Sequence, residues 1–167
     1  MKDLGSLSRV LGIEVRRDRC NGTTTVSQGS YILEELKIYG FDECQGVPIP
    51  VEGKVKISAP EGRSGNPTEY RGMVGSLMYA STGTRPDIEY EVHQAARRVD
   101  DPCWKDFSTC KRVFRYLSTV PDVGITFGGK SNGDRLKGFV TADWAEDVDD
   151  RKSTTGYDFK LNDVAIS

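Results

Sequence analysis

Apolar residues recur with two different spacings along the chain, and the spacing predicts which segments form helices and which form strands. Residues 11–15 and 23–26 are rich in β-branched side chains, and the Asn-Gly that ends the segment between them is typical of a turn. This pattern predicts a β-hairpin. The next segment is predicted to be a helix because its apolar residues recur at helical spacing between candidate caps: Ile32, Leu36 and Tyr39, with Ser27 or Ser30 before them and Gly40 after them.

Three apolar stripes at helical spacing predict a helical middle of the chain. The first contains Tyr70, Val74, Leu77 and Met78; the second follows Pro86 and contains Ile88, Val92, Ala95, Ala96 and Val99; the third contains Trp104, Phe107, Cys110, Phe114 and Leu117. Pro86 suits a first helical turn, and Asp100-Asp101-Pro102 is expected to stop the second helix. We interpret the stripes as core packing between helices and against a sheet, not as cofactor sites.

From residue 123 onward the spacing changes to two, which predicts strands. The predicted strands are Val123 to Phe127, Leu136 to Ala142, Tyr157 to Leu161 and Val164 to Ile166. We therefore expect an α+β protein with an N-terminal β-hairpin plus helix, a helical middle segment and a C-terminal antiparallel sheet of three or four strands. Residues 45–67 contain Pro48, Pro50, Pro60 and Pro67 without periodicity, which is typical of an exposed linker. The expected organisation is a hairpin with a helix at 1–44, a linker at 45–67, a helical segment at 68–120 and the C-terminal sheet at 121–167.

Composition limits the classes of function. The 167 residues, 37% hydrophobic and 29% charged, suit one ordinary domain or two small ones. Four cysteines without a CxxC pair and one histidine argue against a structural zinc site. The N-terminus carries no apolar run and no segment is long enough to span a membrane, so we expect an intracellular protein of the cytoplasm or nucleus, not secreted and without membrane partners.

Charge is distributed unevenly although the net charge is only −2. Basic residues gather in the middle of the chain: Arg97, Arg98, Lys105, Lys111, Arg112 and Arg115. Such a cluster is either a solvated helix face or a contact for phosphates. We predict weak nucleic-acid binding by Arg98, Lys111, Arg112 and Arg115. Lys111 and Arg115 are four residues apart and should share a helix face opposite the third apolar stripe.

Two further patterns suggest chemistry that their context does not support. Gly124 to Ser131 matches the phosphate-binding P-loop, but that loop must open a helix, and residues 125–127 are themselves predicted strand. The pairs Asp100-Asp101 and Asp149-Asp150 lack the flanking apolar strands of a polymerase site. The carboxylates from Asp143 to Asp150 could hold a divalent cation or form a solvated loop, and their spacing does not fit a calcium-binding EF-hand loop.

Five blocks of sequence carry a family resemblance. They are Leu11-Gly12-Ile13-Glu14-Val15 followed by Val26-Ser27-Gln28; Tyr70 to Tyr79; Thr84-Arg85-Pro86-Asp87-Ile88; Lys111 to Leu117; and Ala142 to Tyr157. In this order they resemble the Pol polyprotein of copia-type (Ty1/copia) retrotransposons. The resemblance runs from the end of the reverse transcriptase palm, through thumb and connection, into the start of the ribonuclease H domain. It implies an incomplete ribonuclease H-like sheet at the C-terminal end.

The family's catalytic residues are not matched. The resemblance implies a polymerase Asp-Asp motif upstream of Met1, and a first ribonuclease H aspartate where this chain has Thr141. A hydroxyl cannot replace a carboxylate in a two-metal site, although Asp143 lies nearby. The family uses Mg²⁺, and for this chain we predict no catalytic residue, no bound metal and no cofactor.

Three interpretations of function follow. The favoured one is a catalytically inactive fragment or remnant of the reverse transcriptase/ribonuclease H polyprotein, whose partners would be an RNA–DNA hybrid, bound weakly, and the missing polyprotein domains. The alternative is a captured, non-enzymatic module that binds nucleic acid or protein. A metal-dependent nuclease using Asp143 with Asp147 or Glu146 is the least favoured, because the Thr141 position lacks its ligand.

Overall fold

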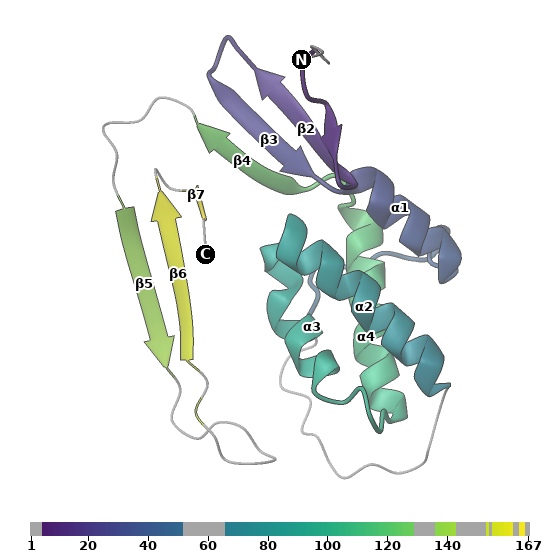
Figure 1. Cartoon of the computed structure of the whole chain (residues 1–167). Helices are drawn as coiled ribbons and strands as arrows, with labels where there is room; N and C mark the ends of the chain where they lie inside the picture. The colour runs from purple at the N-terminus through teal and green to yellow at the C-terminus, as the bar shows by residue number, and fades with distance from the viewer. Residues whose placement is uncertain are drawn as a thin grey trace. The chain divides into compact units, whose positions relative to one another are not determined.

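The computed structural model describes residues 5–51, 66–128, 136–142, 153, 155–161 and 164–165 (Figure 1). The chain divides into two compact units. The first comprises Met1–Val15 and Val26–Gly124, and the second Arg16–Thr25 and Ile125–Ser167. Helices and two sheets follow one another along the chain, so the predicted α+β class is confirmed.

The first sheet contains the predicted hairpin. Its strands are β1 (Arg9–Val10), β2 (Ile13–Asp18), β3 (Thr23–Ser27) and β4 (Gly124–Gly128), in the order β1-β2-β3-β4. Leu11 lies not in a strand but in the two-residue turn Leu11-Gly12, where both residues have positive φ (49° and 78°) and Val10 pairs with Ile13. The segment 123–127 is a strand as predicted, but β4 joins this sheet and not the C-terminal one.

The helices are α1 (Gly29–Ile38), α2 (Pro67–Gly83), α3 (Glu89–Ala96) and α4 (Trp104–Thr119), with a 3₁₀ turn, η1, at Pro86–Ile88. Asn66 caps α2 by accepting a hydrogen bond from the Thr68 N–H (3.0 Å). The N-cap of α1 is Gln28, which makes no side-chain capping bond. The prediction of Ser27 or Ser30 in that role was wrong because the Glu14 carboxylate on β2 accepts the Ser30 N–H (3.1 Å) instead.

The apolar stripes form one core, largely as predicted. It contains Ile32, Leu36, Tyr70, Met73, Val74, Leu77, Ala80, Ile88, Val92, Ala95, Phe107, Cys110, Val113, Phe114 and Leu117. Met78 and Trp104 are exceptions, since they are 45% and 50% exposed. Met73 takes the place expected for Met78, which lies about 100° around the helix from Leu77. Trp104 is the first residue of α4 and so lies at the end of that helix.

The C-terminal sheet consists of β5 (Leu136–Ala142), β6 (Thr155–Leu161) and β7 (Val164–Ala165), in that order and antiparallel. Leu136 pairs with Leu161 and Val140 with Tyr157. The acidic segment Asp143–Asp150 lies outside the described residues.

The described part of the predicted linker, residues 45–51, is not wholly exposed. Val47 is buried, and its N–H donates to the Arg115 carbonyl (3.2 Å) on α4. Arg115 Nε donates to the Gln45 carbonyl (2.8 Å). This stretch therefore packs against the end of α4. Among the described residues no helix is both long and apolar enough to cross a membrane.

Candidate functional site

The basic residues predicted to bind nucleic acid differ in their surroundings. Arg98 and Lys111 are exposed, whereas Arg112 and Arg115 are half-buried. On α4 the opposite face, with Cys110, Phe114 and Leu117, is buried as predicted. Because Arg115 holds the 45–47 segment through its Nε, its guanidinium is partly structural. Of the three predicted residues on α4, Lys111 is the exposed one.

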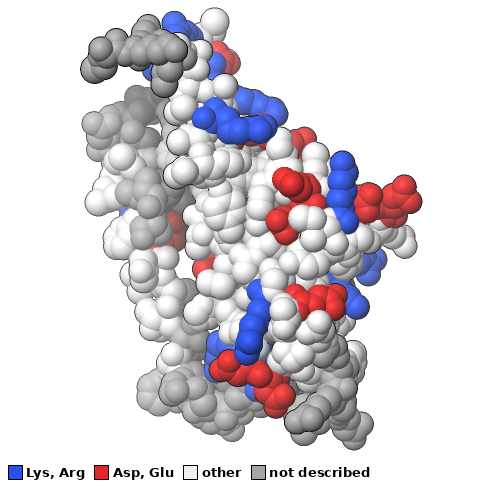
Figure 2. Space-filling model, turned by 45° about the vertical axis from the view of Figure 1, so that its right-hand side comes forward, with Lys and Arg blue, Asp and Glu red and all other residues white. Residues whose placement is uncertain are grey.

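Figure 2 shows how charge is arranged on one face of the molecule. Lys and Arg side chains alternate there with Asp and Glu side chains, and they form no single continuous basic stripe. A strong field that attracts nucleic acid needs charge of one sign gathered together. A phosphate contact on this face is therefore expected to be weak.

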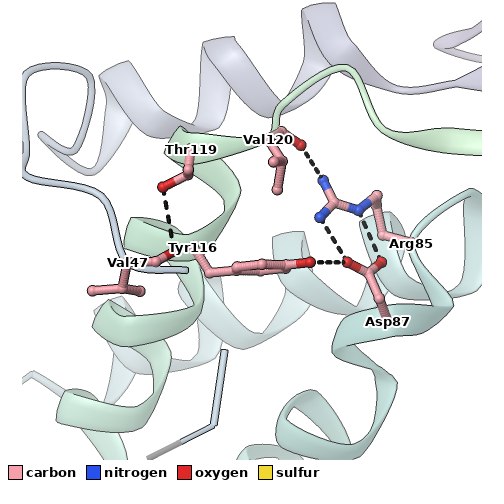
Figure 3. Close-up of polar contacts among 6 residues, drawn as sticks. All are labelled: Val47, Arg85, Asp87, Tyr116, Thr119 and Val120. Carbon is pink, nitrogen blue, oxygen red and sulfur yellow. Dashed lines mark hydrogen bonds and ion pairs between the residues drawn. The ribbon is translucent and has the colours of Figure 1, made fainter. Parts of the chain in front are cut away.

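The most highly organised polar group in the first unit surrounds Arg85 (Figure 3). We call Arg85, Asp87, Tyr116 and the Val120 carbonyl the Arg85 network. Arg85 is completely buried, and its Nε and Nη2 donate to the two oxygens of Asp87 (2.9 and 2.8 Å). Its Nη1 donates to the Val120 carbonyl (2.7 Å), and the Tyr116 hydroxyl donates to Asp87 Oδ2 (2.8 Å). Every group of the network thus has a partner, and η1 is joined to the end of α4.

The electrostatics of the network are those of a stable ion pair. Burial alone would raise the pKa of Asp87, but hydrogen bonds from Arg85 and Tyr116 and the charge of Arg85 lower it below its usual value. Burial and the neighbouring Asp87 raise the pKa of Tyr116. Asp87 therefore stays ionised and Tyr116 stays protonated at neutral pH. Neither group is prepared to transfer a proton, so the network is a structural device.

Other family blocks meet in the same unit. The Thr84 hydroxyl donates to Gln28 Oε1 (3.0 Å), and Gln28 Nε2 donates to the Tyr79 carbonyl (3.4 Å). The Tyr79 hydroxyl donates to the Leu11 carbonyl. Gln28 is fully buried, so the block around β3 is fixed to the end of α2. Blocks whose contacting residues are 51 to 68 positions apart in sequence thus hold one another in place.

Thr141 stands where the family resemblance implies the first ribonuclease H aspartate, and its surroundings can be compared with what a metal site needs. Thr141 is exposed on β5 and pairs with Gly156 on β6. Its hydroxyl is neutral, whereas Mg²⁺ is held by carboxylates. No group of three or more His, Cys, Asp or Glu that could hold a metal ion occurs among the described residues. Mg²⁺ therefore does not fit this part of the chain, and Asp143 lies outside it.

Sequence reasoning did not assign a role to Arg85, Asp87 or Gln28, although all three lie in the family blocks. One signal was available for the ion pair. Arg85 and Asp87 flank Pro86 directly before an apolar helix stripe. Two opposite charges therefore lie at the start of a helix whose apolar face is buried, where a charge needs a partner. Gln28 gave no such signal because a glutamine at a strand end is most often solvated.

Comparison with curated proteins finds relatives that cover the whole chain. It is 36% identical over 174 residues to the retrovirus-related Pol polyprotein from transposon TNT 1-94 of Nicotiana tabacum. It is 38% identical over 168 residues to that from transposon RE1 of Arabidopsis thaliana. An uncharacterized mitochondrial protein of Arabidopsis thaliana is 33% identical over 161 residues, which are 94% of this chain and 64% of that protein. No protein-family model matches the sequence, and no solved structure matches the fold.

The polyprotein matches span the whole of this chain and place it in the class of retrovirus-related Pol polyproteins of transposons. The chain belongs to the copia-type Pol family. It spans 13% of the TNT 1-94 polyprotein and 11% of the RE1 polyprotein. The resemblance inferred from the sequence blocks is therefore confirmed at the level of the family.

Proposed function

We propose that this chain is a non-catalytic part of a copia-type reverse transcriptase/ribonuclease H polyprotein, and that it gives a weak, sequence-independent contact to the backbone of an RNA–DNA hybrid. The observation that carries the proposal is the convergence of the family blocks on buried hydrogen bonds. Arg85, Asp87 and Gln28 bond within the protein, and no described group of the network is poised for proton transfer. Such an arrangement supports a frame and not a reaction centre.

Lys111 supplies the principal contact in this proposal, and Arg98 and Arg112 are the further members of the basic cluster that contribute to it. Lysine contacts to phosphates release counterions, so affinity falls as salt rises, by about 0.9 in log–log slope for each contact on a duplex. The protein as a whole carries a net charge of −2, which repels the same ligand. Binding is therefore expected only at low salt.

Fluorescence anisotropy with a labelled RNA–DNA hybrid at several KCl concentrations tests the contact. Lys111→Ala is expected to weaken binding severalfold and to reduce the salt slope by about one. Lys37→Ala on α1, where Lys37 is also exposed, is the matched control and should leave both unchanged. Equal binding by the parent and Lys111→Ala would assign Lys111 to a solvated face.

Activity assays test the non-catalytic part of the proposal. Primer extension and hybrid cleavage with Mg²⁺ are both expected to be absent. Magnesium-dependent cleavage of the hybrid that disappears in Asp143→Ala would refute the proposal and favour a nuclease.

A further inference from the structure

The connection between β2 and β3 carries a charged depression that the helical basic cluster does not include. It has a volume of about 410 Å³ and is lined by Arg17, Asp18, Arg19, Gly22 and Thr24. All five residues belong to the second unit, whereas Lys111 belongs to the first. Arg17 and Arg19 are exposed to solvent.

Asp18, which lines the same depression, forms no ion pair with either of these arginines in the described part of the chain. Its Oδ1 accepts the N–H groups of Cys20 (2.9 Å) and Asn21 (3.1 Å), and its Oδ2 accepts the side-chain amide of Asn21 (2.6 Å). These bonds, the Asn21 side chain's first, lower the pKa of Asp18. The carboxylate is thus turned into its own loop, which it holds in shape. Neither Arg17 nor Arg19 has an ion pair within the described part of the chain.

The lining favours one class of ligand. The guanidinium groups of Arg17 and Arg19 and the hydroxyl group of Thr24 can donate hydrogen bonds to the oxygens of a phosphate. Arginine binds phosphate with two parallel hydrogen bonds. The depression contains no aromatic side chain on which a base could stack, and no side-chain amide that could read a base edge. Its contact would therefore be with the phosphodiester backbone and independent of sequence.

We propose that Arg17 and Arg19, with Thr24, form a second phosphate-binding site at the tip of the β2–β3 hairpin, and that its ligand is the nucleic-acid backbone. The nucleic-acid part of this proposal rests on the proposed function, whereas the phosphate site itself does not. The hydrogen bonds of Asp18 fix the backbone of the loop before the ligand arrives, so less ordering of the loop is needed on binding.

Two measurements on the full chain test the site. In the first, hybrid binding by the double variant Arg17→Ala/Arg19→Ala is compared with that of Lys37→Ala. The double variant is expected to bind about tenfold more weakly at low salt, with a salt slope smaller by about two. In the second, inorganic phosphate is titrated while the arginine Nε–H signals are followed by NMR. The Arg17 and Arg19 signals are expected to shift and to saturate.

The outcomes separate this proposal from the previous one. If phosphate leaves the signals of both arginines unmoved, the site is refuted whatever the hybrid does. If phosphate shifts them but the parent does not bind the hybrid, the phosphate site stands while the proposed function and the nucleic-acid ligand fail. If hybrid binding depends on Lys111 and not on Arg17 and Arg19, the proposed function stands and the nucleic-acid ligand of the hairpin fails. Equal binding of a polyglutamate peptide through the same two arginines would refute the nucleic-acid ligand.

Discussion

Arg85 has no exposed surface, yet it carries a full charge into the core. Moving a charge out of water is unfavourable, and only a partner with good geometry compensates for it. Asp87 provides that partner with two hydrogen bonds, and Val120 satisfies the remaining side of the guanidinium. Removing Asp87 would therefore leave the charge of Arg85 buried without a counterion.

Asp87→Ala is expected to lower the free energy of unfolding by about 2–3 kcal/mol at pH 7, because it leaves Arg85 buried without its counterion. This is less than for a fully buried pair because one third of the Asp87 side chain is exposed. Tyr116→Phe removes only one hydrogen bond and should cost about 1 kcal/mol. Urea unfolding measures both.

The same pair has a defined dependence on pH. The folded pKa of Asp87 lies below its ordinary value of 3.8, so its contribution is complete above that value and is lost as pH falls through the folded pKa. The difference in stability between the parent and Asp87→Ala should therefore shrink below about pH 4. A difference that stays constant down to pH 2 would show that the charge of Asp87 is not its cause.

Glu91 shows the opposite behaviour. It is buried on α3, and its Oε1 has no hydrogen-bond partner among the described residues. Burial, and secondarily the charge of Asp87, raise its pKa above 4.5. A carboxyl group whose pKa is raised by folding contributes to the free energy of unfolding. This contribution is complete below the pKa of the unfolded state and is lost as pH rises through the pKa of the folded state.

Glu91→Gln should therefore raise the free energy of unfolding at pH 7 by about 1 kcal/mol and make it less dependent on pH between 4 and 7. Glu89→Gln, at an exposed position of the same helix, is the control and should change little. Thermal unfolding at several pH values measures the effect. A lower midpoint for Glu91→Gln at pH 7 would mean that the Glu91 carboxylate is favourably paired.

At the scale of elements, the chain contains glycines with opposite requirements. A Cβ on Gly124, at the start of β4, would collide with the Val26 carbonyl and come within 2.8 Å of Ser27 Cβ. A Cβ on Gly75, in the middle of α2, would meet nothing within 4 Å. One glycine thus permits two strands to approach, while the other only weakens a helix.

Gly124→Ala is expected to destabilise the first unit by about 1–3 kcal/mol because β3 and β4 must move apart. Gly75→Ala should stabilise it by about 0.5–1 kcal/mol through helix propensity alone. Chemical denaturation of the two variants beside the parent tests the opposite signs. A neutral Gly124→Ala would show that β4 does not need this close approach.

The elements also show what the sequence could and could not predict. Spacing identified the helices and strands because burial of one face imposes a period on side chains wherever the element packs. It could not identify the partner of β4, since a spacing of two is the same in every sheet. The cap of α1 was missed for a related reason, because Glu14 supplies it from another element.

At the scale of the whole molecule, the family could be predicted from the order of the sequence blocks, but the structural reason for these blocks could not. The polar contacts of Gln28, Arg85 and Asp87 depend on distant residues, and local patterns carry little information about them. The acidic segment Asp143–Asp150 carried the strongest family signal and lies outside the described residues. Its metal chemistry stays a prediction, as does binding by the basic cluster.

The C-terminal sheet leads to a prediction about association. Antiparallel partners share a face, so Leu136, Val140, Tyr157 and Leu161 lie together, and each is at least 42% exposed. Contiguous apolar surface of this kind promotes contacts between molecules. Sedimentation velocity should show association that increases with concentration and is reduced in Val140→Lys. Thr141→Lys adds the same charge to the other face and should have less effect; equal effects would assign the association to charge alone.

The order in which the chain is synthesised limits when the hydrogen bonds of Gln28 and of the Arg85 network can form. The hydrogen bond between Thr84 and Gln28 cannot form until Thr84 has been synthesised. The hydrogen bond from Arg85 Nη1 to the Val120 carbonyl cannot form until Val120 has been synthesised. During synthesis, roughly 90 residues separate the emergence of Gln28 from that of Val120, which at about 5–20 residues per second is on the order of 5–20 s. Asp87 emerges roughly 30 residues before Val120, so for the last part of that interval, on the order of 2–7 s, Arg85 has its carboxylate partner but not the Val120 carbonyl. Ribosome-bound chains that stop before Tyr116 should therefore be cut readily by proteases within residues 26–51 and 66–88, and chains in which Val120 has emerged should resist cleavage there.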